Sequence, residues 1–206
     1  MALIQIPYIK QAKGSTMCGL ACASMIFKFY KEKKIDQSIA FDEIKEISTL
    51  GRYYCKTHKI SQYLTQSGLS CTVIRYTDLK DFLLFCNNNA IAPIINHRSF
   101  EDNIGGHFSV VKNVIQHSII VNDPENKNRK IVSFSEILQA VDIKNHQDEI
   151  GGRVAIIPNI LKKEIQYLPC SKCYTNIDIT TVSVANMSKK SIEHIICNHC
   201  DSAQII

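Results

Sequence analysis

One cysteine, one histidine and one aspartate are placed along this chain in a way that suits nucleophilic acyl transfer. Cys18 opens an apolar stretch with helical spacing, His107 follows two glycines at the start of an apolar strand, and Asp123 ends the next predicted strand. A thiolate can attack a carbonyl carbon, a histidine can pass the proton to the leaving group, and a carboxylate can orient the imidazole. Together the three residues predict a hydrolase that works through a thioester on Cys18.

Each of these residues also has a plain structural interpretation. Cys18 could be one more buried thiol, His107 could simply end a loop, and Asp123 could begin an Asp-Pro turn. The combination favours catalysis, because a helix start stabilises a thiolate and neighbouring strands can hold a histidine beside a carboxylate. Gly19, directly after the cysteine, would let a substrate approach the backbone.

The elements that must position these residues change in periodicity along the chain. Cys18 to about Lys33 predicts a buried helix, and further helices are predicted over 41–48 and 59–66. Beyond them we predict short helices over 78–85 and 135–141, and strands over 71–76, 90–96, 107–115, 118–123, 130–134 and 153–158. Helices followed by an antiparallel sheet indicate an α+β fold.

Two Cys-x-x-Cys pairs lie near the C-terminus, Cys170 with Cys173 and Cys197 with Cys200. Zinc prefers four soft ligands in a tetrahedron, and each pair can present two thiolates from one tight turn. Residues 177–184 and 191–196 both alternate like strands, so we predict a zinc ribbon in which a β-hairpin joins the two pairs. Two disulfides or free thiols are the alternative to this structural zinc site.

The composition is that of a globular protein with one main domain and a small second unit. The 206 residues are 45% hydrophobic and carry a formal charge of +5 without a block of like charges, which does not favour nucleic-acid binding. We find no transmembrane run and no signal peptide, which predicts a cytoplasmic protein. We divide the chain into a catalytic domain 1–158, a linker 159–169 and a zinc-ribbon-like unit 170–206.

Several stretches resemble the C39-type peptidases, papain-like enzymes that include those removing double-glycine leaders from bacteriocin precursors. The resemblance rests on IPYIKQ (6–11), CGLACASMI (18–26), GHFSVV (106–111) and NDP (122–124), and it extends over about residues 5–158. It implies a papain-like fold, in which N-terminal helices pack on an antiparallel sheet.

The same resemblance implies roles for four residues. Cys18 would be the nucleophile, His107 the acid and base, Asp123 the orienting carboxylate, and Gln11 the amide of the oxyanion hole. No cofactor is implied for catalysis. The substrate would be a peptide or protein, with a Gly-Gly-like cleavage site as the candidate, although a cysteine-rich unit stands here in place of a transporter.

Other functions and partners remain open. The acyl-enzyme could pass its acyl group to an amine, Cys18 could attack a side-chain amide as in a deamidase, or the fold could bind a leader or partner without cutting it. The C-terminal unit has five lysines and four acidic residues over 160–206, and it could itself bind a partner. We expect a peptide or protein substrate, and an inhibitor or immunity-type protein is a further candidate partner. The protein would process a peptide in the producing cell or act as a toxin-type protease delivered to another cell without a signal peptide.

Overall fold

The computed structural model describes residues 4–12, 15–49, 51–101, 105–125, 127–142, 151–161, 164–189 and 191–205. Its centre is an eight-stranded antiparallel sheet in the order β12-β11-β3-β8-β4-β5-β6-β7. The bounds of these strands are β3 Cys71–Tyr76, β4 Ile94–Arg98, β5 Gly106–Ile115, β6 Ser118–Asp123, β7 Lys127–Ser133, β8 Val154–Pro158, β11 Ile192–Ile196 and β12 Ala203–Ile205. Two short hairpins lie outside the sheet, β1 Glu46–Ile47 with β2 Tyr53–Tyr54, and β9 Tyr167–Pro169 with β10 Asn176–Asp178.

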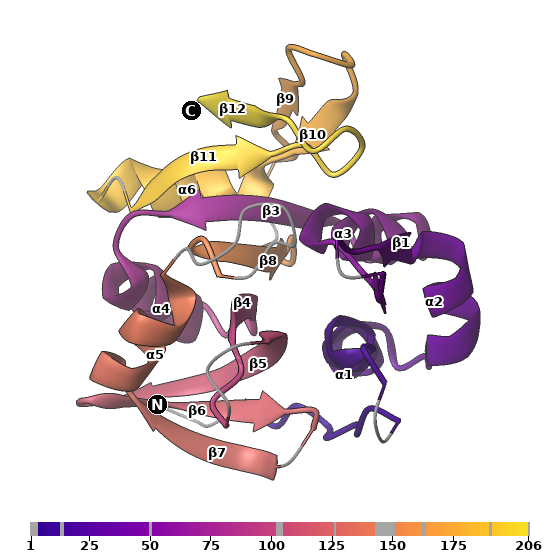
Figure 1. Cartoon of the computed structure of the whole chain (residues 1–206). Coiled ribbons are helices and arrows are strands. Elements are labelled where there is room, and N and C mark those ends of the chain that lie inside the picture. Colours follow the sequence, from indigo (N-terminus) through magenta and orange to yellow (C-terminus); the bar gives the residue numbers. More distant parts are fainter. Residues whose placement is uncertain are drawn as a thin grey trace.

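Helices cover both faces of this sheet. Figure 1 shows α1 (Cys18–Lys31), α2 (Gln37–Ile44) and α3 (Thr57–Gln66) on one side, and α4 (Leu79–Asn88) and α5 (Phe134–Val141) on the other. Alternate residues of the central strands belong to two different cores, with Val73 and Ile94 in the core of α1 and α3, and Ile74 and Ile95 in the core of α4 and α5. The helices-on-sheet α+β architecture predicted from the sequence is therefore confirmed.

Most of the predicted elements occur close to their expected positions. The strands predicted over 71–76, 107–115, 118–123 and 153–158 each coincide with an observed strand to within a residue. The second helix, however, begins at Gln37 and not at residue 41, because Asp36 caps it by accepting hydrogen bonds from the backbone N–H groups of Ser38 (2.9 Å) and Ile39 (3.2 Å). In the same way α5 is capped by Ser133, two residues before the predicted cap at Ser135.

The C-terminal segment differs from the prediction in its secondary structure. Only Asn176–Asp178 is a strand, and Thr180–Lys189 forms the helix α6, so the predicted strand over 177–184 is wrong. The cause is local, because Asp178 Oδ1 accepts hydrogen bonds from the backbone N–H (3.0 Å) and hydroxyl (2.6 Å) of Thr180 and turns the chain into a helix. The predicted hairpin between the two cysteine pairs is therefore absent from this described segment.

Instead, the C-terminal strands extend the central sheet. β11 pairs with β3 on one side and with β12 on the other, so the segments 1–158 and 170–206 share one sheet. Polar contacts reinforce this junction, since Ser70 donates a hydrogen bond to the Asp178 carboxylate (2.7 Å) and Asn159 donates one to the Asp178 carbonyl (3.1 Å). The division at residues 158 and 170 stays a prediction, and the two segments it separates are continuous in hydrogen bonding. Within the described ranges, none of the helices combines the length and apolarity needed to cross a membrane.

Candidate active site and metal centre

Cys18 is the first residue of α1, a helix whose next nine residues, 19–27, are all buried. Met17 precedes the helix without a side-chain capping bond, and the first turn has no acidic residue among the described side chains. The first N–H groups of a helix lack intrahelical partners and carry the positive end of its dipole. The Cys18 thiol therefore lies where a negative charge is stabilised.

His107 and Asp123 form a buried pair on adjacent strands. His107 Nε2 lies 2.9 Å from Asp123 Oδ1, and the two side chains are 6% and 3% exposed. The same carboxylate oxygen accepts a hydrogen bond from the backbone N–H of Glu125 (3.1 Å). Because Nε2 faces the carboxylate, Nδ1 is the ring nitrogen left to face other groups.

The protonation of this pair follows from its contacts. Burial alone lowers the pKa of His107, but hydrogen bonds with Asp123 and Cys18 outweigh it and raise the pKa to about 10. Burial raises the pKa of Asp123, but the hydrogen bond and charge of His107 bring it below its ordinary value. At neutral pH the pair is therefore an imidazolium beside a carboxylate, in the cleft that Cys18 also lines.

Gly19 explains how close α1 lies to the histidine strand. A Cβ atom at this position would clash with the side chain of Ile60 and lie 3.1 Å from the ring of Phe108. The Cys22 thiol, one turn later, donates a hydrogen bond to the Phe108 carbonyl (3.3 Å). The glycine thus serves helix-to-strand packing, a different reason from the substrate approach expected from the sequence.

Gln11 lines a cleft that Cys18 and His107 also line, and its side-chain oxygen makes no hydrogen bond to any described residue. The cleft has a volume of about 260 Å³ and is lined by Gln11, Ser15, Thr16, Cys18, Gly19, Ser48, Arg52, Tyr53, Tyr54, Cys55, Asn96, Gly105, Gly106, His107, Phe108 and Glu125. The backbone N–H of Gln11 donates to Pro124 O (3.0 Å), and its side-chain Nε2 makes a long bond to Ser15 O (3.4 Å). Its buried Oε1 has no hydrogen-bond partner among the described residues. The amide group is therefore held near Cys18 with little to fix its direction.

A second histidine lies against His107 and was not singled out by the sequence. His97 is directly opposite His107 in the β4–β5 register, with ring centroids 5.4 Å apart and nearly perpendicular planes. Its Nδ1 lies 2.6 Å from Arg98 O, and its Nε2 lies 3.0 Å from Ser109 Oγ. Burial and the nearby charge of His107 lower the pKa of His97 to about 3, so this ring stays neutral. Only the strand register brings the two rings together, and the sequence holds no signal for that register.

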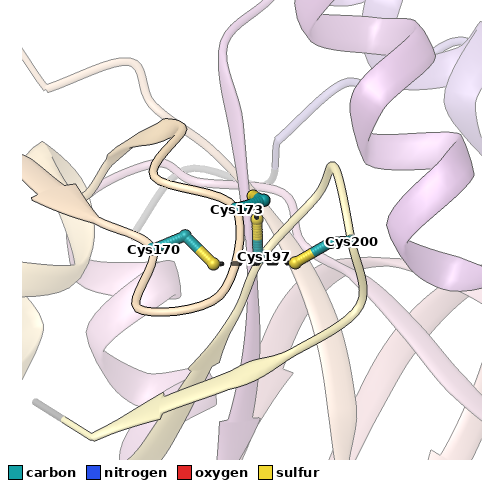
Figure 2. Close-up of side chains that lie close together, drawn as sticks. All are labelled: Cys170, Cys173, Cys197 and Cys200. Atoms are coloured by element: carbon teal, nitrogen blue, oxygen red, sulfur yellow. Dashed lines mark hydrogen bonds between the residues drawn. The ribbon is translucent and has the colours of Figure 1, made fainter.

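The four C-terminal cysteines converge from two turns, as Figure 2 shows. Their sulfur atoms all lie within 4.8 Å of one another, with Cys170–Cys200 at 3.6 Å and Cys173–Cys197 at 3.7 Å. Zinc–sulfur bonds of about 2.3 Å in a tetrahedron place the sulfurs about 3.8 Å apart, so these four thiols fit the ion. This grouping matches the predicted ligand set, although each pair lies in its own hairpin, β9–β10 or β11–β12.

Hydrogen bonds to sulfur favour the thiolate at Cys170 and Cys173, whereas burial raises the pKa of Cys197 to about 12. Burial would raise the pKa of Cys170, but hydrogen bonds from the Ser202 hydroxyl and from the N–H groups of Cys173 and Lys172 lower it to about 5. The pKa of Cys173 is also lowered, first by the Thr175 hydroxyl. Such N–H and O–H donors around sulfur are the usual surroundings of a metal-binding thiolate.

A thiol at the start of a buried helix, facing a histidine–carboxylate pair on an antiparallel sheet, is the arrangement of a papain-like cysteine peptidase. Residues 5–140 of the chain match the peptidase C39 family. The chain therefore belongs to the peptidase C39 family and is a cysteine peptidase, as its sequence motifs predicted.

Solved structures show the same fold. A double glycine motif protease from an AMS/PCAT transporter, in complex with its leader peptide, is 17% identical with a TM-score of 0.50, and the match covers 76% of this chain and 94% of that one. A putative C39-like peptidase from Bacillus anthracis is 14% identical with a TM-score of 0.59, covering 79% and 100%. The peptidase domain of Streptococcus ComA, a bi-functional ABC transporter of a quorum-sensing pathway, is 20% identical with a TM-score of 0.52, covering 74% and 98%. No curated protein matches the chain in sequence.

Proposed function

We propose that Cys18, His107 and Asp123 are the catalytic triad, and that they hydrolyse a peptide bond through a thioester on Cys18. The observation that supports this most is the buried His107–Asp123 hydrogen bond of 2.9 Å, beside a thiol at a helix start in the same cleft. The raised pKa of His107, about 10, keeps the ring protonated at neutral pH. A protonated ring beside Cys18 favours the thiolate that the reaction needs.

In the proposed reaction the Cys18 thiolate attacks the carbonyl carbon of the scissile peptide bond. The tetrahedral intermediate collapses as His107 gives its Nδ1 proton to the leaving amine, which leaves the acyl group on sulfur. A water molecule then attacks the thioester while His107 takes one of its protons, and the acid product and the thiolate–imidazolium pair are restored. Asp123 holds the ring in one orientation through Nε2 during both steps.

Gln11 is the proposed side-chain donor to the oxyanion. Its amide is buried at the cleft, and its hydrogen bond to Ser15 O is long, at 3.4 Å, so the Nε2 group can turn toward a charged oxygen at little cost. The uncapped N–H groups at the start of α1 supply the second donor. Donors aimed at the developing oxyanion stabilise the transition state more than the substrate.

The proposed substrate is a peptide, and a Gly-Gly pair before the scissile bond is the first sequence to test. One of the similar structures is a double glycine motif protease bound to a leader peptide. Gly105, Gly106, Tyr53 and Tyr54 are among the residues that line the cleft, and the two glycines have no side chains to exclude a peptide backbone. An inhibitor or immunity-type partner stays a prediction.

The four-cysteine cluster is proposed to bind a structural zinc ion through Cys170, Cys173, Cys197 and Cys200. A bound zinc ion would link the β9–β10 and β11–β12 hairpins without taking part in peptide hydrolysis. Metal analysis of the purified protein should find about one zinc per chain, and replacement of Cys200 by serine should lower that ratio.

Peptide hydrolysis by matched cysteine variants tests the triad. The parent, Cys18→Ala, His107→Ala and Cys55→Ala are incubated with a peptide library rich in Gly-Gly sites, and the products are identified by mass spectrometry. Cys55 is the matched control, since its thiol lines the same cleft. We expect cleavage by the parent and by Cys55→Ala only, and new amide products in the presence of added amine would identify an acyl transferase. Peptide binding without cleavage by the parent would overturn the proposal and favour a binding module.

A further inference from the structure

We propose that the four-cysteine metal centre positions the peptidase cleft, through contacts of Asp201 and His199 with helix α3. This inference rests on the proposed function of the cleft and adds a structural requirement for it. The metal would fix the turn Cys197–Ser202, the turn would hold α3, and α3 would hold residues beside Cys18.

The first link joins the metal-binding turn to α3. Asp201, directly after Cys200, has its Oδ1 3.2 Å from Nδ1 of His58, whose side chain is only 5% exposed. One helical turn further along α3, Gln62 Nε2 lies 3.4 Å from Nδ1 of His199. Residues four apart share one face of a helix, so this turn contacts α3 at two successive positions.

Closure of the metal-binding turn decides where Asp201 lies. Its backbone N–H donates to Cys197 O (3.0 Å), and the Cys197 N–H donates to Ser202 O (2.9 Å). The four sulfur atoms lie within 4.8 Å of one another, and a bound metal ion would join the turn to Cys170 and Cys173 through metal–sulfur bonds that are lost, with proton uptake by the thiols, when the metal leaves. Metal loss would therefore open the turn and move the Asp201 carboxylate away from His58.

The second link joins α3 to the cleft. Ile60, on α3, fills the space above Gly19, the residue that follows Cys18. Thr57 Oγ1, in the first turn of α3, accepts a hydrogen bond from Asn96 Nδ2 (3.3 Å), and Asn96 lines the cleft. Tyr54 and Cys55, which also line the cleft, lead directly into this helix.

The His58–Asp201 contact lies in the first turn of α3. The C-terminal half of α3 is bonded to β3 separately, because the Ser61 hydroxyl donates to Cys71 O (3.3 Å) and the Cys71 N–H donates to Thr65 Oγ1 (3.1 Å). At the other end Lys56 supplies no side-chain cap. The His58–Asp201 contact therefore acts on the half of α3 that carries the cleft contacts.

A pair of glycine substitutions separates this positioning role from metal binding. Tyr174 and Asp201 each follow the second cysteine of a pair, and both have a left-handed backbone, with φ of 60° and 61°. Glycine suits that conformation at both positions, so Asp201→Gly and Tyr174→Gly disturb the two turns alike. Only Asp201 faces α3, whereas Tyr174 is 82% exposed.

Three measurements are made on the parent and on both variants at saturating zinc. They are zinc content, hydrogen exchange of the amides of residues 57–61, and the rate at which a limiting alkylator labels Cys18, followed by peptide mapping. We expect full zinc in all three proteins, with faster exchange and about fivefold slower labelling only in Asp201→Gly, a size typical of coupled sites. If Asp201→Gly matches Tyr174→Gly in exchange and labelling at full zinc, the inference is overturned.

Zinc removal from the parent gives an independent measurement. A chelator should slow Cys18 labelling and speed exchange over residues 57–61, and added zinc should reverse both effects. If far-ultraviolet circular dichroism shows that the metal-free protein unfolds, the inference is tested by the comparison of Asp201→Gly with Tyr174→Gly alone. Failure of the proposed function has a different signature, because a parent that cleaves no peptide can still show Cys18 labelling that depends on zinc and on Asp201. A parent that cleaves peptides while the two glycine variants behave alike would instead refute only the positioning role.

Discussion

Replacement of Asp123 by asparagine tests whether the His107 imidazolium depends on its carboxylate partner. Burial by itself lowers the pKa of His107, yet the hydrogen bonds with Asp123 and Cys18 raise it from 6.5 to about 10. At about 1.4 kcal/mol per pKa unit, this difference corresponds to about 5 kcal/mol in favour of the protonated ring. Asparagine keeps the shape of the side chain but removes its charge, so burial would then favour the neutral ring.

The consequence appears in the pH dependence of kcat/KM. In the parent the ring stays protonated until about pH 10, so a proton is available for the leaving amine throughout the neutral range. In Asp123→Asn the alkaline limb should move down by about two to three pH units, and kcat near neutral pH should fall by about 100-fold or more.

The assay combines peptide hydrolysis across the pH range with nuclear magnetic resonance of ¹⁵N-labelled histidine, which reports the pKa of His107 directly. His97→Gln is a useful comparison, because His97 touches the same ring without providing the carboxylate. A parent pKa near 6.5, or an alkaline limb that stays in place in Asp123→Asn, would refute the reasoning.

Stability should depend on pH with a sign fixed by the same two groups. The folded-state pKa of His107 lies above its unfolded value, so its contribution is complete below about pH 6.5 and is lost as the pH rises through about 10. The pKa of Asp123 lies below its ordinary value, so its contribution is present above about pH 4 and is lost as the pH falls through that lowered value. Urea denaturation should therefore show the largest difference between the parent and Asp123→Asn between about pH 4 and 6.5.

Three further outcomes follow from the packing and the sites. Gly19→Ala should lower the free energy of unfolding by about 1–3 kcal/mol, because its methyl group meets Ile60 and Phe108, and an unchanged urea midpoint would contradict this. Gln11→Ala should lower kcat by about 10²–10³ with little change in KM, and a loss confined to KM would argue against an oxyanion role. Chelation should lower the melting temperature of the parent but not of a Cys170→Ser, Cys173→Ser variant, as calorimetry would show.

Local patterns in the sequence were enough to identify most of the elements and the residues of the candidate site. The buried helix from Cys18 and the strands of His107 and Asp123 have strong periodicity, which depends on short-range geometry alone. The structure brings these residues and Gln11 together, and their catalytic roles stay predictions. The two Cys-x-x-Cys pairs could be recognised as easily, because the spacing of each pair depends only on one tight turn.

What the sequence did not reveal depends on contacts between distant segments. The alternating residues of 177–184 suited a strand, and the Asp178–Thr180 hydrogen bonds turned most of them into α6. The pairing of β11 with β3 joins segments far apart in the chain, and no local pattern specifies that partner. The same holds for His97 beside His107 and for Ile60 above Gly19, since register and helix packing determine both.

The place of β11 also determines which strand forms one edge of the sheet. β3 is buried on both faces, and without β11 its outer row of N–H and C=O groups would lie open at the end of the sheet. Long, flat, apolar edge strands recruit strands of other chains, and proteins protect them with short or irregular neighbours. Here the three-residue β12 forms the outer edge, and the β11–β3 register contains an irregularity between Ile192 and His194. The C-terminal segment thus covers a strand edge that could pair with other chains. A chain cut before this segment would expose the backbone of β3 as a template for aggregation.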